Sequence, residues 1–256
     1  MATAVPPIQE LHAPASWRTA EFISDLHLQA GEPATFEAWR CYMQASPADA
    51  VFILGDLFEI WVGDDAAAEP GFAADCAAVL QAAARLRPVF FMHGNRDFLV
   101  GAGFMQSCGA TLLEDPTVLV FAGHRWLLTH GDALCLSDAQ YLQFRAVVRA
   151  PGWQHAFLAR PLAERGAIAR DLRGQSEARR KTGVDYGDVD STAATHWLEA
   201  ADATTMIHGH THRPANHVLP GRRQRIVLSD WDAAAKPPRL EALRLDATGA
   251  QRIALA

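Results

Sequence analysis

The sequence predicts an α/β fold in which helices cover a layered sheet. Five short apolar runs are each closed by polar residues, and runs of this length are typical of strands buried on both faces. Alanine-rich segments between them, such as FAADCAAVLQAAARL (72–86), combine strong helix formers with an apolar spacing that predicts covering helices. Strands that alternate with helices indicate a layered α/β domain. The runs are AEFI (20–23), AVFIL (50–54), PVFFM (88–92), RWLLT (125–129) and TTMI (204–207).

The length and composition indicate one elaborated domain. The chain has 256 residues, of which 50% are hydrophobic and 20% charged, so it can bury one sizeable core and has the composition of a soluble globular enzyme. We expect residues 1–20 to be a poorly ordered extension, and residues 21–256 to form the domain with a helical cap inserted at about 137–183. We find neither a signal-peptide pattern nor an apolar run of about 20 residues that would span a bilayer.

The charge of the chain bears on its partners and its compartment. A formal net charge of −6 argues against nucleic acid as a partner, because duplex binding takes its affinity from Lys and Arg that neutralise phosphates. The stretch 138–183 carries a net charge of +5 and the rest of the chain −11, so a basic insert sits on an acidic body. The cysteines are far apart without a CxxC spacing, which predicts reduced thiols in a cytoplasmic protein. They are Cys41, Cys76, Cys108 and Cys135.

Polar side chains with metal-binding chemistry follow each of the five apolar runs. The carboxyl ends of strands in α/β sheets line a common crevice, where residues from separate loops converge. Taken singly, an aspartate after a strand is often a helix N-cap and a histidine is often a satisfied core residue. The same coincidence at five strand ends favours a metal site. The candidate ligands are Asp25, His27, Asp56, Asn95, His130, His210 and His212.

The donor set indicates the kind of metal. Carboxylate, amide oxygen and imidazole without thiolate favour borderline or hard divalent ions, such as Mn²⁺ or Fe²⁺, over a structural zinc site. Asp25 with His27, and His210 with His212, are spaced i, i+2, which places each pair on one face of an extended chain. Seven donors are too many for one ion, so we expect two divalent ions bridged by the carboxylate of Asp56.

The order and spacing of these residues resemble the calcineurin-like metallophosphoesterases. The matching pattern is DLH (25–27), GD (55–56), GNRD (94–97), His130 and GHTH (209–212). The resemblance implies a four-layer αββα sandwich, two metal ions and hydrolysis at phosphorus. His208 precedes the pattern and is expected not to bind metal. The resemblance places Asp25, His27, Asp56 and His212 around one ion and Asp56, Asn95, His130 and His210 around the other.

One position departs from the common pattern of that superfamily. Most members carry histidine after GN, where it is viewed as helping to protonate or orient the leaving oxygen, whereas this chain has Arg96. Arginine cannot act as a general acid near neutral pH, but it can hold phosphate oxygens and neutralise developing charge. A phosphate leaves as a stable anion, so Arg96 indicates a diphosphate substrate. Asp56 and Arg96 are therefore the expected catalytic residues.

The wider wording is similar to one group of that family, the UDP-2,3-diacylglucosamine diphosphatases of lipid A synthesis. The similar segments include GDLFEIWVGDD, HGNRDFLVGAGF and HGDALCLSDAQYLQFRAVVR. The resemblance implies Mn²⁺-dependent attack of water on the phosphorus next to uridine, which gives lipid X and UMP at the cytoplasmic face of the inner membrane. It implies no protein partner. The substrate-binding residues that it implies are Asn95, Arg96, Asp138, Ser176, Arg180, Lys181 and His210.

The insert between HGD and GHTH is predicted to form two or more helices that are broken at APGW (150–153) by a Pro-Gly pair. Its apolar residues either pack these helices onto the body or shelter acyl chains, and its arginines either form a solvated face or contact anionic lipid headgroups. The apolar residues are Tyr141, Leu142, Phe144, Val147, Val148, Trp153, Phe157, Leu158 and Leu162, and the arginines are Arg145, Arg149, Arg160, Arg165, Arg170, Arg173, Arg179 and Arg180.

Other functions stay open at this point. A hydrolase of the same fold that acts on a soluble nucleotide diphosphate-sugar would have the same metal ligands. A catalytically inactive binding scaffold would usually lack some of the ligands, and here all seven are present. A nuclease is disfavoured by the acidic charge and by the lack of an aromatic and basic binding stripe.

Overall fold

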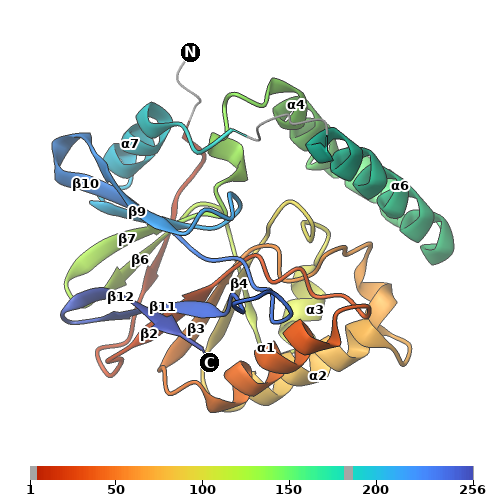
Figure 1. Cartoon of the computed structure of the whole chain (residues 1–256), viewed down its shortest axis with the longest axis horizontal. Helices are drawn as coiled ribbons and strands as arrows, with labels where there is room; N and C mark the ends of the chain where they lie inside the picture. The colour runs from red at the N-terminus through yellow and green to blue at the C-terminus, as the bar shows by residue number, and fades with distance from the viewer. Residues whose placement is uncertain (1–4, 182–186, 256) are drawn as a thin grey trace.

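The structure is a computed structural model that describes residues 5–181 and 187–255, without the side chains of residues 175–181. Within these residues, two six-stranded sheets pack face to face, and helices cover both outer faces (Figure 1). The strand order is β1-β6-β7-β8-β10-β9 in one sheet and β12-β11-β2-β3-β4-β5 in the other. This arrangement confirms the predicted α/β sandwich of four layers.

Parallel pairs form the centre of each sheet, and antiparallel pairs occur outside that centre, although one edge of each sheet, β1 with β6 and β5 with β4, is also parallel. β2, β3 and β4 are parallel, as are β7, β8 and β10. The strands of the first sheet are β1 (Gln9–His12), β6 (Thr117–Phe121), β7 (His124–Leu128), β8 (Thr205–His208), β10 (Arg223–Val227) and β9 (Ala215–Leu219). Those of the second are β12 (Gly249–Ala254), β11 (Glu241–Asp246), β2 (Ala20–Ile23), β3 (Ala50–Leu54), β4 (Val89–Met92) and β5 (Thr111–Leu113).

The central strands direct alternate side chains into two apolar layers. In β3, Phe52 points between the sheets, whereas Val51 and Ile53 point toward the helices. The ring of Phe52 stacks between Phe22 and Phe90, with ring centroids 4.8 and 4.6 Å apart, so an aromatic ladder crosses three neighbouring strands. Because both faces are covered, these strands are apolar at nearly every position, which explains the continuous apolar runs of the sequence.

The outer layers are helical. Trp39 of α1 and Trp197 of α7 are almost fully buried against opposite sheets. Fully burying a large apolar side chain contributes about 1.5–3 kcal/mol. Asp190 caps α7 by accepting a hydrogen bond from the backbone N of Ala193. The helices are α1 (Pro33–Ala45), α2 (Phe72–Ala84) and α3 (Ala102–Ser107) on one face and α7 (Ser191–Ala200) on the other.

The expectation of a poorly ordered extension over residues 1–20 is wrong for its second half. Residues 9–12 form β1, which pairs in parallel with β6, and Trp17 packs edge-on against Phe52 and Phe90. No apolar run marks this strand in the sequence, because β1 lies at the edge of its sheet and most of its side chains are exposed. The search for continuous apolar runs therefore did not detect this edge strand.

The inserted segment forms α4 (Ala139–Val148), α5 (Pro151–Leu158) and α6 (Leu162–Lys181). The predicted break at residues 150–153 is confirmed, because α4 ends before Pro151 and α5 begins at it. In the described part of the chain, none of the helices has the length and apolar character needed to cross a membrane.

Ion pairs in which one partner is buried fix this cap to the body. Arg165 of α6 is 2% exposed, and its guanidinium donates to the carboxylate of Asp65, in the loop after β3. Asp132, which follows β7, is fully buried and accepts from Nε of Arg145 at 2.8 Å. Buried charges must be paired, so these contacts determine where the cap sits.

The four cysteines are not paired with one another in the structure. Cys41 is exposed and the other three are buried. Burial raises the pKa of Cys76 and of Cys135 to about 12, which keeps these thiols protonated and inert at neutral pH.

Candidate metal centre

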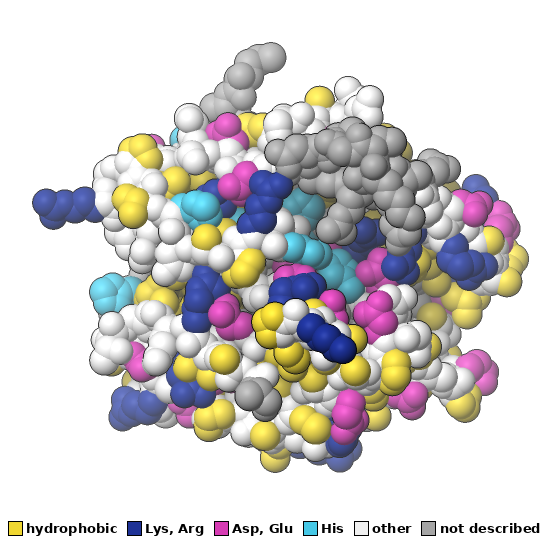
Figure 2. Space-filling view, in the orientation of Figure 1, with side chains coloured by type: hydrophobic (Ala, Val, Ile, Leu, Met, Phe, Trp, Pro, Cys, Tyr) yellow, Lys and Arg dark blue, Asp and Glu magenta, His cyan; other side chains and the backbone are white. Residues whose placement is uncertain are grey.

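The centre lies where the carboxyl ends of five strands from both sheets meet. Loops that follow β2, β3, β4, β7 and β8 carry the predicted ligands, and parallel pairing within each sheet brings these strand ends to one side. Figure 2 shows histidine and acidic side chains gathered near the centre of one face of the molecule. The structure therefore brings all seven predicted ligands together.

Backbone conformation aims these side chains. Five of the seven predicted ligands have positive φ angles between 49° and 68°, a region that L residues other than Asn, Asp and His seldom enter. Two glycines allow the loops to approach closely. A Cβ on Gly94 would overlap the carboxylate of Asp56, and one on Gly209 would overlap Asp25. The five residues are Asp25, His27, Asp56, His210 and His212.

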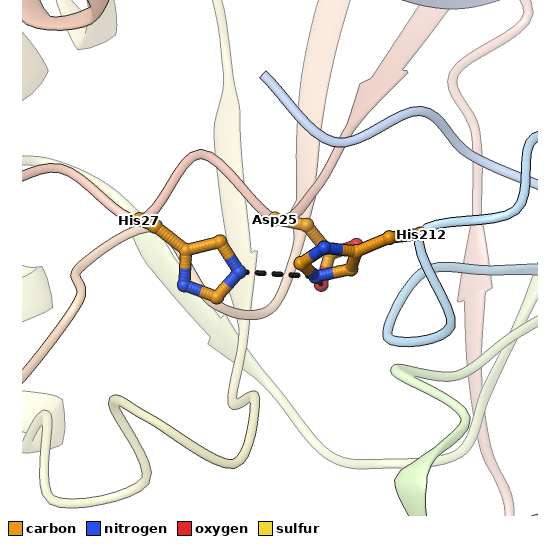
Figure 3. A group of neighbouring side chains, drawn as sticks. All are labelled: Asp25, His27 and His212. Atoms are coloured by element: carbon orange, nitrogen blue, oxygen red, sulfur yellow. Dashed lines mark hydrogen bonds and ion pairs between the residues drawn. The ribbon is translucent and has the colours of Figure 1, made fainter. Parts of the chain in front are cut away.

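One group of donors consists of Asp25, His27 and His212 (Figure 3). The Nε2 atoms of His27 and His212 face one another at 3.1 Å, and Nε2 of His212 lies 3.3 Å from Oδ1 of Asp25. The far side of Asp25 is held by the hydroxyl of Ser24, which donates at 2.6 Å, and by the backbone N of His210 at 2.9 Å.

A second group surrounds the side-chain oxygen of Asn95. This oxygen lies 3.0 Å from Nε2 of His130 and 2.8 Å from Nδ1 of His210. Asp56 lies between the two groups, because its Oδ1 is 3.7 Å from Nε2 of His130 and its Oδ2 is 3.9 Å from Nε2 of His27. This carboxylate is therefore in position to contact ions in both groups.

The hydrogen bonds behind the histidines show that a cation fits. The carbonyl of Leu54 can only accept, so Nδ1 of His130, 2.9 Å away, carries the proton in the neutral ring. Nε2 then directs a lone pair at Asn95. In the same way, the carboxylate of Glu59 lies 2.9 Å from Nδ1 of His27 and leaves Nε2 unprotonated toward His212. Where both facing nitrogens are unprotonated, their lone pairs repel unless a cation lies between them.

The carboxylates also set the electrostatics of the metal-free pocket. Burial lowers the pKa of His130, but the carboxylates of Asp56, Asp25 and Asp132 outweigh this effect and raise it to about 9. Burial also opposes ionisation of Asp25, yet the imidazole of His212 holds the pKa of this carboxyl well below its usual range. A pocket with this negative potential attracts cations.

Two carboxylates that the sequence reasoning did not single out support the ligand loops. Asp97 accepts from the backbone N of Leu57 and of Gly94, both at 2.8 Å, and so joins the loops after β3 and β4. Burial, together with the charge of Asp56, raises the pKa of Asp97 to about 7. Glu59 contacts His27, and its pKa is lowered despite burial, by the hydrogen bond and charge of His27. Asp97 is the last letter of GNRD, so the motif itself contained the signal.

The other predicted site residues have different surroundings. The backbone N of Arg96 donates to Oδ1 of Asp56 at 2.8 Å, and its guanidinium lies 3.8 Å from Glu59 beside the centre. Asp138 caps α4 by accepting from the backbone N of Tyr141 at 2.9 Å. The side chains of Ser176, Arg180 and Lys181 lie outside the described residues.

Tyr141 is a further neighbour that sequence reasoning placed only among the apolar residues of the cap. Its ring stacks on His210 at a centroid distance of 6.0 Å, and its hydroxyl donates to Asp132. His208, expected not to bind metal, is fully buried behind the centre, where its Nε2 faces Nη1 of Arg225 at 3.3 Å.

The family follows from sequence comparison. The signature of the calcineurin-like phosphoesterases matches residues 22–214, a span that contains every predicted ligand. The chain belongs to the calcineurin-like phosphoesterase family. The predicted resemblance is thereby confirmed.

Three relatives of this phosphoesterase share most of their length with it, and each is named UDP-2,3-diacylglucosamine hydrolase. The one from Chromobacterium violaceum is 52% identical over 219 residues, which cover 82% of this chain and 89% of the relative. The one from Bordetella pertussis is 46% identical over 89% of this chain and 92% of its own. The one from Xanthomonas axonopodis pv. citri is 44% identical over 91% and 97%.

The geometry predicts how metal binding depends on Asn95. We expect the purified protein to bind two Mn²⁺ per chain, and Asn95→Ala to weaken binding of one ion by about 10-fold or more, because a ligand between His130 and His210 is lost. Equilibrium dialysis with elemental analysis measures both. Asn216→Ala, on the edge strand β9, serves as the matched control. Two equally tight ions in Asn95→Ala would contradict the assignment.

Proposed function

We propose that the chain hydrolyses the diphosphate of UDP-2,3-diacylglucosamine and releases 2,3-diacylglucosamine 1-phosphate (lipid X) and UMP. The observation that carries the proposal is the convergence of seven donors, five in two carboxylate–histidine clusters and Asn95 and His210 beside them, in a chain that is 44–52% identical, over most of its length, to relatives named for hydrolysis of this substrate. Without that set of donors, the likeness alone would also fit an inactive relative.

The metal centre holds two divalent ions, with Mn²⁺ as the natural occupant. One ion is bound by Asp25, His27, Asp56 and His212, and the other by Asp56, Asn95, His130 and His210. Oxygen and imidazole donors without thiolate support Mn²⁺ over a structural zinc site. Bound ions of this kind supply a more acidic water and positive charge for the phosphoryl oxygens.

The chain's own side chains orient and neutralise the diphosphate. Arg96 reaches the centre from the loop after β4, anchored through its backbone to Asp56, and its guanidinium holds phosphate oxygens. The leaving lipid X phosphate departs as an anion, so Arg96 need only stabilise its charge. Asn95 and His210 contact the phosphoryl group beside it. Asp138, at the start of α4, together with Ser176, Arg180 and Lys181, contacts the sugar and its acyl linkages.

The exposed apolar side chains of the cap support an acylated substrate. We assign residues 137–183 to a cap inserted into a phosphoesterase domain that begins near residue 21 and gains β1 at one edge. Seven large hydrophobic residues are exposed in the described part of the chain, and five of them lie in α4 to α6. A hydrolase of a soluble nucleotide diphosphate-sugar has no need for them. The five are Phe144, Val147, Leu158, Leu162 and Leu172.

The same surface supports peripheral attachment to the cytoplasmic face of the inner membrane. Exposed apolar side chains enter the headgroup region, and basic side chains near an anionic surface contribute about 1 kcal/mol each. The cap carries both kinds of residue, since residues 138–183 have a net charge of +5.

Activity is tested with Mn²⁺-loaded protein and UDP-2,3-diacylglucosamine, with UMP release as the measurement. We expect turnover by the unaltered chain and a loss of about 100-fold or more in Asp56→Ala and in Asn95→Ala, because each removes a metal ligand. Removing the acyl chains from the substrate should abolish turnover. Undiminished activity in both variants would overturn the site assignment, and full activity on the deacylated substrate would favour the soluble-substrate alternative.

The role of Arg96 is tested by changing the leaving group. The unaltered chain should strongly prefer a nucleotide diphosphate-sugar over a simple alkyl phosphodiester, because an alkoxide leaving group needs a proton that Arg96 cannot give. Arg96→Ala should lower kcat/KM for the diphosphate by about 100-fold, whereas Arg85→Ala, on the exposed end of α2, should not. Comparable steady-state rates with both substrates would contradict the proposed role.

Membrane attachment is tested by flotation with anionic liposomes. The unaltered chain should float at low salt and be released at high salt, since screening weakens the attraction of basic residues to the surface. Val147→Ser combined with Leu158→Ser should reduce flotation. Val218→Ser, which alters a 90% exposed side chain on β9, is the control and should float normally. Protein that stays at the bottom at low salt would argue against attachment.

A further inference from the structure

We propose that Glu59 is a positioning residue that couples the cap helix α6 to the metal centre. Glu59 follows the GD motif in the sequence GDLFE and is 7% exposed. Its carboxylate is shared by three side chains, one from the metal centre, one from the phosphate-binding loop and one from the cap. The inference rests on the proposed function only for what the cap does to substrate.

The contact with the metal centre is made through His27. Oε2 of Glu59 lies 2.9 Å from Nδ1 of His27, on the side of the ring that faces away from His212. A carboxylate in this place fixes the ring orientation, keeps the proton on Nδ1 and makes Nε2 a better ligand. The backbone holds Glu59 in place, because its N donates to the carbonyl of Leu28 at 3.1 Å, one residue after His27.

The contact with the cap is made through Arg173 of α6. Nε of Arg173 lies 3.0 Å from Oε1 of Glu59, and its Nη1 donates to Oε1 of Gln29 at 3.3 Å. Gln29 lies two residues after His27, and Glu59 contacts the ring of His27, so these two partners of Arg173 are both next to the metal ligand. On the other side, Nη1 of Arg96 lies 3.8 Å from Oε1 of Glu59. Oε2 of Glu59 therefore contacts the metal ligand, and Oε1 contacts the two arginines.

The negative charge of Glu59 therefore links three side chains: the metal ligand His27, Arg96 and Arg173 of α6. Removing Arg173 leaves Glu59 with less positive charge around it and frees α6 from the loops beside His27. Removing the charge of Glu59 leaves Arg173 and Arg96 without their common carboxylate and His27 without its orienting acceptor. Because coupling between two sites is reciprocal, metal bound at His27 should stabilise the contact of α6 with the body to the same extent that this contact strengthens metal binding.

The experiment uses two variants that approach the contact from opposite sides, Glu59→Gln and Arg173→Met, and their combination. Mn²⁺ affinity is measured by the electron paramagnetic resonance signal of free Mn²⁺. The local stability of α6 is measured by hydrogen exchange of its amides with and without Mn²⁺. Neither measurement requires a substrate. Matched controls are Glu37→Gln and Arg40→Met, which alter an exposed Glu–Arg pair on α1. The melting temperature of each metal-free variant reports whether the fold is intact.

We expect Glu59→Gln to weaken the affinity of one Mn²⁺ by about 10-fold to 100-fold. Arg173→Met should weaken it less, by about 5-fold. Mn²⁺ should slow exchange in α6 of the unaltered chain and of both controls, but not in either variant. In the double variant the loss of Mn²⁺ affinity should equal that of Glu59→Gln alone, because the contact is already broken.

Three results would overturn the proposal: unchanged Mn²⁺ affinity in Glu59→Gln, Mn²⁺-dependent protection of α6 that survives in Arg173→Met, or losses that multiply in the double variant. A chain that binds Mn²⁺ as expected but does not hydrolyse UDP-2,3-diacylglucosamine would reject the proposed substrate, while the coupling between Glu59, α6 and the metal would still be decided by these measurements.

Discussion

The structure is organised around a point where oxygen and nitrogen lone pairs from two sheets face one another. Nε2 of His27 opposes Nε2 of His212, and the oxygen of Asn95 opposes two imidazoles. With these nitrogens unprotonated, the arrangement is repulsive by itself and becomes favourable around cations. The surrounding fold must therefore force the donors together. It does so with positive φ angles, with glycines that let the loops approach, and with Asp97, which ties two loops through their backbone.

The two sheets and the cap are held in place by different interactions. The apolar layers between and outside the sheets fix the strand ends, and hence the ligands, to within a few ångströms. The cap is held differently. Buried charges in the body or in the cap, such as Asp132 and Arg165, secure it at its ends. Several of its large apolar side chains stay exposed as a result. The cap is thus held both by ion pairs and by Phe157, which packs in the core of the body, while other apolar side chains of the cap remain exposed.

Sequence reasoning succeeded for features that are encoded in short stretches of the chain. The central strands were predictable because both of their faces are buried, and the ligands because they directly follow those strands. It failed for β1, an edge strand with mostly exposed side chains. It also missed Glu59, because nothing in GDLFE distinguishes a carboxylate beside a metal ligand from one in solvent. Asp138 was predicted to contact the substrate, a role that stays a prediction, and the structure shows in addition that it caps α4 through the backbone N of Tyr141.

The sequence by itself determined the α/β class, the seven candidate ligands and the resemblance to a metallophosphoesterase, because local periodicity and motif order encode these features directly. Only the tertiary structure decided which nitrogen of each histidine faces the centre, which side chains support the ligand loops, and which charges link the cap to the centre. These depend on contacts between residues more than a hundred positions apart, such as Arg173 with Gln29 and His212 with His27. No spacing along the chain records such contacts, since they arise from how the sheets and the cap pack.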